Sequence, residues 1–241
     1  PHDGYARIKE FKNLIKAYNE EGITIIMDVV YNHVNGLSGC NFDVLMPFYY
    51  FRYTESGGAS NGSGCGNETA SDKLMFRKFM IDSIDFWTKE YKLGGYRFDL
   101  MGIHDIETMN QLVASAKKIN PYVCIYGEPW AGGTTALPAG SVAAVQANAS
   151  QYVGYGQFND KMRDAMIKSG MSTVGNKGWV TQDAYAPDPG DILYGIKGNT
   201  VGCTDDPDKT VSYATCHDNY TLHDRAVVAG ISDETKIEKM N

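Results

Sequence analysis

Residues 23–30 have the sequence Ile23-Thr24-Ile25-Ile26-Met27-Asp28-Val29-Val30. This nearly continuous apolar and β-branched run is typical of a strand that is buried on both faces of a parallel sheet. Apolar residues at helical spacing precede it over residues 5–21, and Gly22 stands where a C-cap glycine would end that helix. A helix that leads into a buried strand favours an α/β fold.

The alternation of strand and helix continues to the end of the chain. Its order predicts a parallel sheet with right-handed crossovers. No GxGxxG follows the first strand and no GxxxxGK[ST] occurs, so a nucleotide-binding sheet loses support and a (β/α)8 barrel is favoured. The further strands are predicted over residues 95–99, 122–128, 155–158 and 211–216, and the further helices over residues 71–91, 105–119 and 160–167, with a last helix from about Thr221.

Residues 34–71 interrupt this alternation. They carry no sustained apolar period and are dense in Gly, Ser and Asn. Loops of this length are commonly either functional or disordered. We therefore predict an inserted loop region over residues 34–71 within one domain that covers residues 1–241.

Charge and apolar content restrict the partners. The chain has 29 Asp and Glu against 22 Lys and Arg, a net charge of −7, and no basic run, which argues against nucleic acid. No apolar stretch approaches the roughly 20 residues that cross a bilayer, and Pro1-His2-Asp3-Gly4 does not resemble a signal peptide. We expect a soluble protein, either cytoplasmic or secreted, with no membrane partner, whose gene product begins upstream of Pro1.

The five cysteines are scattered and form no CxxC pair or His-Cys cluster suited to zinc. A metal site built on sulfur is therefore not expected. Cys124 and Cys216 lie in apolar strand-like runs and are expected to be small buried residues. Cys40 and Cys65 lie in the Gly/Ser/Asn-rich region, and both a disulfide between them and two free thiols stay open.

Polar and charged side chains end four of the predicted strands. In barrels and in open α/β sheets, this carboxyl edge is where ligands bind. Arg97 and Asp99 are two residues apart on a strand, so they face the same way, and the guanidinium can hold the carboxylate ionised and oriented as a nucleophile requires. The candidates are Asp28 with Asn32 and His33, Arg97 with Asp99, Glu128, and His217 with Asp218.

Glu128 ends the strand that follows Asp99 and is itself followed by Pro129-Trp130. A neighbouring aromatic ring and the loss of water raise the pKa of a carboxyl group, which a general acid needs at neutral pH. Two carboxylates with separated pKa values on adjacent strand ends describe a glycosidase pair.

Each of these residues also has a structural alternative. A carboxylate that closes a strand often caps a helix or accepts loop hydrogen bonds, and Arg97 with Asp99 can be an ion pair at a barrel rim. His33 and His217 can be hydrogen-bonded core residues, and Trp130 can serve packing alone. The recurrence of such groups at four strand ends in chain order favours the catalytic interpretation.

Four segments in chain order resemble the four conserved regions of the α-amylase superfamily, glycoside hydrolase family 13. Within it the chain is most similar to the debranching subgroup of type I pullulanases, especially over residues 61–71 and 95–102. The resemblance implies a partial (β/α)8 TIM barrel that holds about strands 3 to 7, with a long loop inserted after the first strand present. The segments are Asp28-Val29-Val30-Tyr31-Asn32-His33, Gly95-Tyr96-Arg97-Phe98-Asp99, Tyr126-Gly127-Glu128-Pro129-Trp130 and Cys216-His217-Asp218-Asn219.

The resemblance also implies an activity, the retaining hydrolysis of α-1,6 branch linkages in pullulan- and starch-type α-glucans. It implies no required cofactor; calcium is common in the superfamily, but no cluster of ligands in this sequence marks a site for it. His217 and Asp218 are adjacent, so the backbone must bend there if both touch substrate. The implied roles are nucleophile for Asp99, general acid/base for Glu128, third carboxylate for Asp218, sugar-ring contacts for Arg97, His33 and His217, support for Asp28 and Asn32, and leaving-group contacts for Trp130 and Asn219.

Three alternatives remain open at this level. The first is an isoamylase or glycogen-debranching enzyme of the same superfamily. The second is a catalytically inactive carbohydrate-binding homologue, although Asp99, Glu128 and Asp218 are all present. The third is a metal-dependent barrel enzyme in which Asp28, Glu128 and Asp218 are magnesium ligands.

The superfamily's first, second and eighth barrel strands have no counterpart in these 241 residues. An unclosed barrel exposes sheet edges and lacks part of its active-site floor. We therefore expect the purified 241-residue chain to fold poorly and to release no detectable sugar from pullulan. Robust reducing-sugar release by this chain would contradict the expectation.

Overall fold

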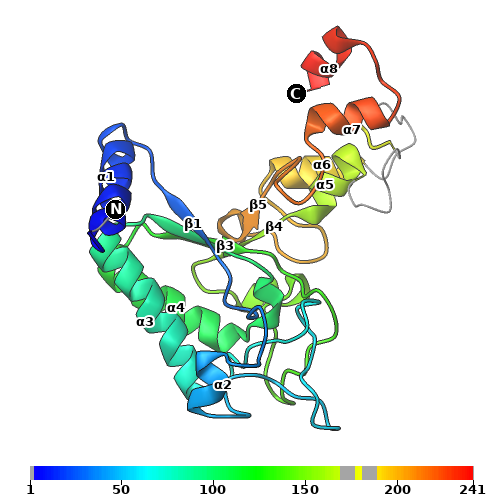
Figure 1. The fold of residues 1–241 in the computed structure, drawn as a ribbon. Helices are drawn as coiled ribbons and strands as arrows, with labels where there is room; N and C mark the ends of the chain where they lie inside the picture. Colours follow the sequence, from blue (N-terminus) through cyan, green and yellow to red (C-terminus); the bar gives the residue numbers. More distant parts are fainter. Residues whose placement is uncertain (1–2, 169–176, 181–188, 241) are drawn as a thin grey trace. The chain divides into compact units, whose positions relative to one another are not determined.

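The structure is a computed structural model that describes residues 3–168, 177–180 and 189–240. It divides into two compact units, Pro1–Gly156 and Gln157–Asn241. Figure 1 shows the elements of both, coloured along the chain. Each unit is described separately below.

The first unit is built around a parallel three-stranded arrangement. Strand β2 pairs with β1 on one edge and with β3 on the other, and both pairs are parallel. The register sets Asp28 opposite Arg97 and Arg97 opposite Tyr126. The elements are α1 (Ala6–Glu20), β1 (Ile26–Val29), α2 (Asn41–Leu45), α3 (Leu74–Tyr91), β2 (Gly95–Phe98), the 3-10 turn η1 (Met101–Ile103), α4 (Ile106–Ile119), β3 (Cys124–Gly127) and the 3-10 turn η2 (Gln146–Gln151).

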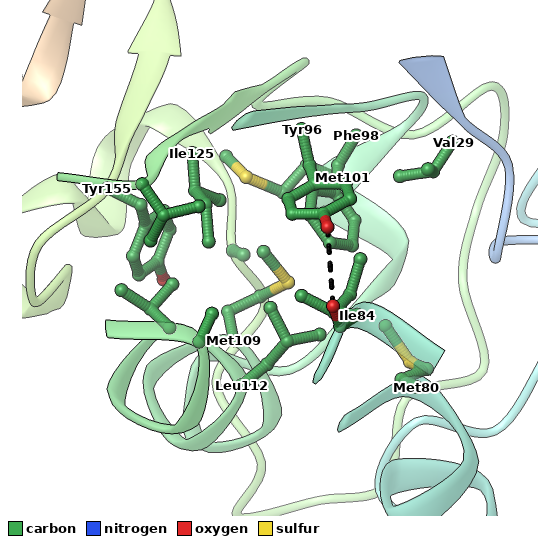
Figure 2. Packing of buried hydrophobic residues seen from close by; sticks show 14 of the residues in the cluster. Val29, Met80, Ile84, Tyr96, Phe98, Met101, Met109, Leu112, Ile125 and Tyr155 are labelled. Carbon is green, nitrogen blue, oxygen red and sulfur yellow. Dashed lines mark hydrogen bonds between the residues drawn. The ribbon is translucent and has the colours of Figure 1, made fainter. Parts of the chain in front are cut away.

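An apolar core lies between these strands and the pair of helices α3 and α4. Figure 2 shows Tyr96 and Ile125 from the strands lying among Ile84 of α3 and Met109 and Leu112 of α4. The Tyr96 hydroxyl donates a hydrogen bond to the Ile84 carbonyl oxygen at 3.3 Å, so this buried polar group is satisfied. The core therefore holds the sheet by one face and leaves its carboxyl edge to polar residues.

Local sequence explains how two of these elements are placed. Asp105 caps α4, because its side chain accepts a hydrogen bond from the Thr108 backbone N–H at 2.8 Å. Gly127 ends β3 where a Cβ atom would lie 2.7 Å from the Phe98 carbonyl oxygen. Only glycine permits this approach, which brings the ends of β2 and β3 together.

The second unit contains a shorter parallel pair. Gln157 of β4 lies opposite Thr210 of β5, and Phe158 lies opposite Val211. Asn159 caps the helix after β4 through the Met162 N–H, and Thr221 caps α7 through the Asp224 N–H. The elements are β4 (Gly156–Phe158), α5 (Asp160–Ile167), α6 (Pro189–Ile196), the 3-10 turn η4 (Pro207–Lys209), β5 (Thr210–Val211), α7 (Leu222–Val228) and α8 (Glu234–Met240).

Most predicted elements are confirmed, but two strands differ from expectation. The strand over residues 23–30 is shorter and is not buried on both faces, since Ile26 is 39% and Val30 55% exposed. Met27 and Val29 of β1 pack in the apolar core, whereas Ile26 and Asp28 on the other face are exposed. The strand predicted over 211–216 ends at Val211, beyond which the Ser212 hydroxyl donates to the Gly195 carbonyl.

The thiols and the helices give further outcomes. All five cysteines are free thiols, so Cys40 and Cys65 do not pair. Cys124 is exposed rather than buried because it is the first residue of β3, outside the core, and Cys216 is half-buried. Helices α2, α6 and α8 were not predicted, and α2 lies within the predicted loop region 34–71. No helix among the described residues is long and apolar enough to cross a membrane.

Leu112→Ala in the full-length protein that contains this sequence should destabilise the barrel by about 2–5 kcal/mol, because a fully buried side chain leaves a cavity. Leu74→Ala on α3 is the matched control, since Leu74 is 70% exposed and should change stability by less than about 0.5 kcal/mol. Urea unfolding measures both. Equal effects of the two substitutions would contradict the assignment of the core.

Candidate active site

The ends of β1, β2 and β3 bring six of the predicted residues together in the first unit. Because the strands are parallel and adjacent, their carboxyl ends meet at one edge. That edge is the ligand-binding side of parallel α/β sheets. The six are Asp28, Asn32, His33, Arg97, Asp99 and Glu128.

Arg97 lies at the centre of this group and contacts three carboxylates. Its Nη1 is 3.0 Å from Asp28 Oδ1 and 3.1 Å from Asp99 Oδ1, and its Nη2 is 2.6 Å from Glu128 Oε1. Burial alone would lower the pKa of Arg97, but the charge of Glu128 and the hydrogen bond to Asp28 outweigh it and raise that pKa. The guanidinium therefore stays cationic although its side chain is almost fully buried.

Asp99 is held through both of its carboxylate oxygens. Arg97 binds Oδ1, and the Asn32 side-chain amide donates to Oδ2 at 2.8 Å. The same Asn32 amide also donates to the Asp99 backbone carbonyl at 2.8 Å. These contacts fix the orientation of a carboxylate that is still partly open to solvent, which confirms the predicted pairing of Arg97 with Asp99.

Glu128 is almost fully buried, as its sequence context predicted. The sequence pointed to the neighbouring aromatic ring of Trp130, whereas the contacts of the carboxylate are with Arg97 and a backbone N–H. Oε1 contacts Arg97, and Oε2 accepts a hydrogen bond from the Leu100 backbone N–H at 2.7 Å. Both oxygens of Glu128 are therefore held, one by a guanidinium and the other by a backbone N–H. Trp130 is half-buried, and its backbone carbonyl accepts from Gly102 N–H at 3.1 Å.

Leu100 has an unusual backbone that serves this contact. Its φ of 40° and ψ of 49° lie in the left-handed region, which is strained for a leucine. This conformation turns the chain sharply after Asp99 and directs the Leu100 N–H to Glu128. A hydrogen bond from the turn that directly follows Asp99 therefore connects the two candidate catalytic residues, Asp99 and Glu128.

His33 and its loop are fastened by residues that the sequence did not assign. His33 Nδ1 is 2.5 Å from the Asn32 side-chain oxygen. The Asn32 carbonyl accepts from Thr69 N–H at 2.9 Å, and the side chain of Asn67 bonds both the N–H and the carbonyl of Val34. The signal that could have found Asn67 and Thr69 is the similarity of residues 61–71 to the debranching subgroup.

A further buried histidine lies close to this edge. The ring of His104 meets that of Phe98 edge-on, with centroids 6.3 Å apart. Complete burial lowers the pKa of His104 to about 3, so the imidazole is neutral at physiological pH. It is a packing partner of the strand that carries Arg97.

His217, Asp218 and Asn219 belong to the second unit and follow β5. The bend expected there is confirmed, since His217 and Asp218 lie in a turn with Nε2 and Oδ1 3.2 Å apart. Both are exposed, and Asn219 is half-buried. In the described part of the chain, Cys216, His217 and Asp218 form one group whose potential ligand atoms lie within 4.8 Å, which their adjacency in sequence explains.

No protein-family model matches the chain, but individual proteins do. The pullulanase of Bacillus subtilis (strain 168) is 36% identical over 234 residues, which are 93% of this chain and 31% of that protein. A weaker relative is the glycogen operon protein GlgX homolog of Haemophilus influenzae, 26% identical over 90% of this chain and 32% of its own length. The chain spans about a third or less of the curated relatives that it matches.

Solved structures agree with these relatives. The pullulanase from Bacillus acidopullulyticus matches with a TM-score of 0.91 and 37% identity, over 99% of this chain and 29% of that one. The pullulanase of Anoxybacillus sp. LM18-11 complexed with maltotetraose matches with a TM-score of 0.89 and 41% identity, over 99% of this chain and 34% of that one. The α/β architecture is thus that of a partial (β/α)8 barrel, and the chain belongs to the α-amylase superfamily, glycoside hydrolase family 13, in which it is a pullulanase-type segment.

Proposed function

We propose that the full-length protein hydrolyses α-1,6-glucosidic branch linkages in pullulan- and starch-type α-glucans. One observation carries the proposal: buried Arg97 binds Asp28, Asp99 and Glu128 at the ends of three adjacent parallel strands. Asp99 and Glu128 thereby lie on adjacent strand ends, as the two carboxylates of a glycosidase pair do. The maltotetraose bound by the Anoxybacillus pullulanase supports an α-glucan as the partner.

The proposed mechanism is a double displacement with retention of configuration. Asp99 attacks the anomeric carbon while Glu128 protonates the oxygen of the departing chain. Glu128 then removes a proton from water, which hydrolyses the glycosyl-enzyme intermediate. Asp218 stabilises the oxocarbenium-like transition state. The two contacts on Asp99, from Arg97 and Asn32, support its role because they aim one fixed carboxylate at the substrate.

The remaining candidates bind the sugar in this proposal. Arg97, His33 and His217 are each proposed to hold the sugar ring. Asp28 and Asn32 support Arg97 and Asp99 through the contacts already described. Trp130 and Asn219 contact the departing part of the glucan.

Three alternatives have less support. An isoamylase or glycogen-debranching activity is favoured by the GlgX homolog, but at lower identity than the pullulanases. A magnesium enzyme that uses Asp28, Glu128 and Asp218 is disfavoured because Arg97 already contacts two of these carboxylates as a cation. A catalytically inactive carbohydrate-binding protein is disfavoured because it would not require the fixed orientation of Asp99.

Product analysis on pullulan, a chain of maltotriose units joined by α-1,6 bonds, tests the proposal. The full-length protein should release maltotriose with the α configuration at first appearance, as read by NMR.

Asp99→Asn should lower turnover by at least about a thousandfold while substrate binding stays measurable, because the amide cannot act as nucleophile. Asp82→Asn, an exposed residue of α3 paired with Lys78, is the control. Preference for glycogen over pullulan would support the alternative, and unchanged turnover in Asp99→Asn would reject the mechanism.

We propose further that no cofactor is required. Treatment of the full-length protein with EDTA should leave pullulan hydrolysis unchanged, because protonation and nucleophilic attack are assigned to side chains. Loss of activity that magnesium restores would instead support metal catalysis. Loss that only calcium restores would point to a calcium ion that stabilises the fold.

A further inference from the structure

Asn67 and Thr69 of the segment that resembles the debranching subgroup fasten the loop of His33, but Glu68 between them has no role so far. Asn67, Glu68 and Thr69 are 0–2% exposed, and Glu68 is completely buried. Glutamate is rarely buried unless its charge is paired, because removing a carboxylate from water is costly. The surroundings of Glu68 therefore call for an explanation.

Glu68 binds two groups. Its Oε1 accepts a hydrogen bond from Ala136 N–H at 2.6 Å, and its Oε2 lies 3.8 Å from Arg52 Nη1. Oε2 has no hydrogen-bond partner among the described residues. Gly62 makes room for this oxygen, since a Cβ atom there would lie 1.9 Å from it. Two loops thus converge on one buried carboxylate.

One set of contacts fastens the loop that follows Glu128. Besides the bond from Ala136 to Glu68, the Arg52 guanidinium donates to the Thr135 hydroxyl at 3.2 Å. Gly133 N–H donates to the Gly62 carbonyl at 2.8 Å. Residues 133–136 are therefore tied to residues 52–68 at three points.

A second set of contacts reaches Glu128 through the turn after β2. Arg52 Nη1 donates to the Ile103 carbonyl at 2.9 Å. The neighbouring Gly102 N–H donates to the backbone carbonyls of Glu128, at 3.0 Å, and Trp130, at 3.1 Å. The backbone of Glu128 and Trp130 is thus held by Gly102, the neighbour of the Ile103 that Arg52 binds. The backbone further along, at residues 133–136, is held by Arg52, Glu68 and Gly62.

We propose that Glu68 is a positioning residue for the acid/base Glu128, acting with Arg52 through the 133–136 loop and the turn at Ile103. The proposal deepens the proposed function and rests on it. Glu68 is buried away from solvent and touches no reacting atom. It acts because proton transfer depends on placement of the acid to within a fraction of an ångström.

The test compares two substrates that differ in their need for an acid. The alcohol that leaves pullulan must be protonated, whereas fluoride leaves α-maltosyl fluoride without a proton. In the full-length protein, Glu68→Ala should lower kcat/KM on pullulan by at least about tenfold, because misplaced acid assistance is lost. On α-maltosyl fluoride, the same variant should lose less than about threefold, because attack by Asp99 is retained.

Glu68→Gln covers the case in which Glu68→Ala does not fold. Glutamine keeps the size of the side chain and an acceptor for Ala136 N–H, but it loses the charge that attracts Arg52. It should show the same selective loss on pullulan, of at least about threefold. Glu107→Gln is the matched control, since Glu107 is a 67% exposed partner of Arg77 and should behave as wild type on both substrates.

Two results would overturn the positioning role. Equal losses on both substrates would assign Glu68 to general stability of the fold, and wild-type kinetics in Glu68→Gln on both substrates would show that its charge does not matter. A wild-type protein that cleaves neither substrate would instead reject the hydrolase assignment, and the positioning role with it.

Discussion

A single guanidinium allows three carboxylates to gather at one edge of the sheet. Asp28, Asp99 and Glu128 each place an oxygen 2.6–3.1 Å from Arg97. Without a cation, three such groups would repel one another and resist joint ionisation. The planar fork of arginine suits this task because its donors point in several directions at once, which a lysine cannot match. The parallel register of β1 with β2 sets Asp28 opposite Arg97, so the strand pairing itself places this side chain among the carboxylates.

The alternation of apolar runs and helical periods was enough to predict the parallel α/β fold, and the two-residue spacing of Arg97 and Asp99 was enough to predict their contact. The contact between Arg97 and Glu128 was not predictable, because it depends on how β2 and β3 align across the connection that contains η1 and α4. The open face of β1 was missed for a related reason. Its residues are apolar enough for burial on both sides, but exposure is decided by which elements cover it.

The inserted loop shows where pattern-based inference stops. Residues 34–71 have no apolar period, so their sequence predicted no structure, yet Arg52, Asn67 and Glu68 are buried. Their order comes from polar contacts with the backbone of neighbouring loops, which leave no periodic trace in a sequence. Buried polar networks of this kind specify one conformation, because each unmade bond would be costly.

Leu100 carries a different consequence. A leucine in the left-handed region destabilises the fold by about 1–2 kcal/mol. The same conformation lets the Leu100 backbone N–H donate a hydrogen bond to Glu128. Replacing such a residue with glycine relaxes the backbone at no steric cost. Here the same replacement would loosen the turn between the two carboxylates. Relief of backbone strain and placement of Glu128 therefore make opposing demands on this position.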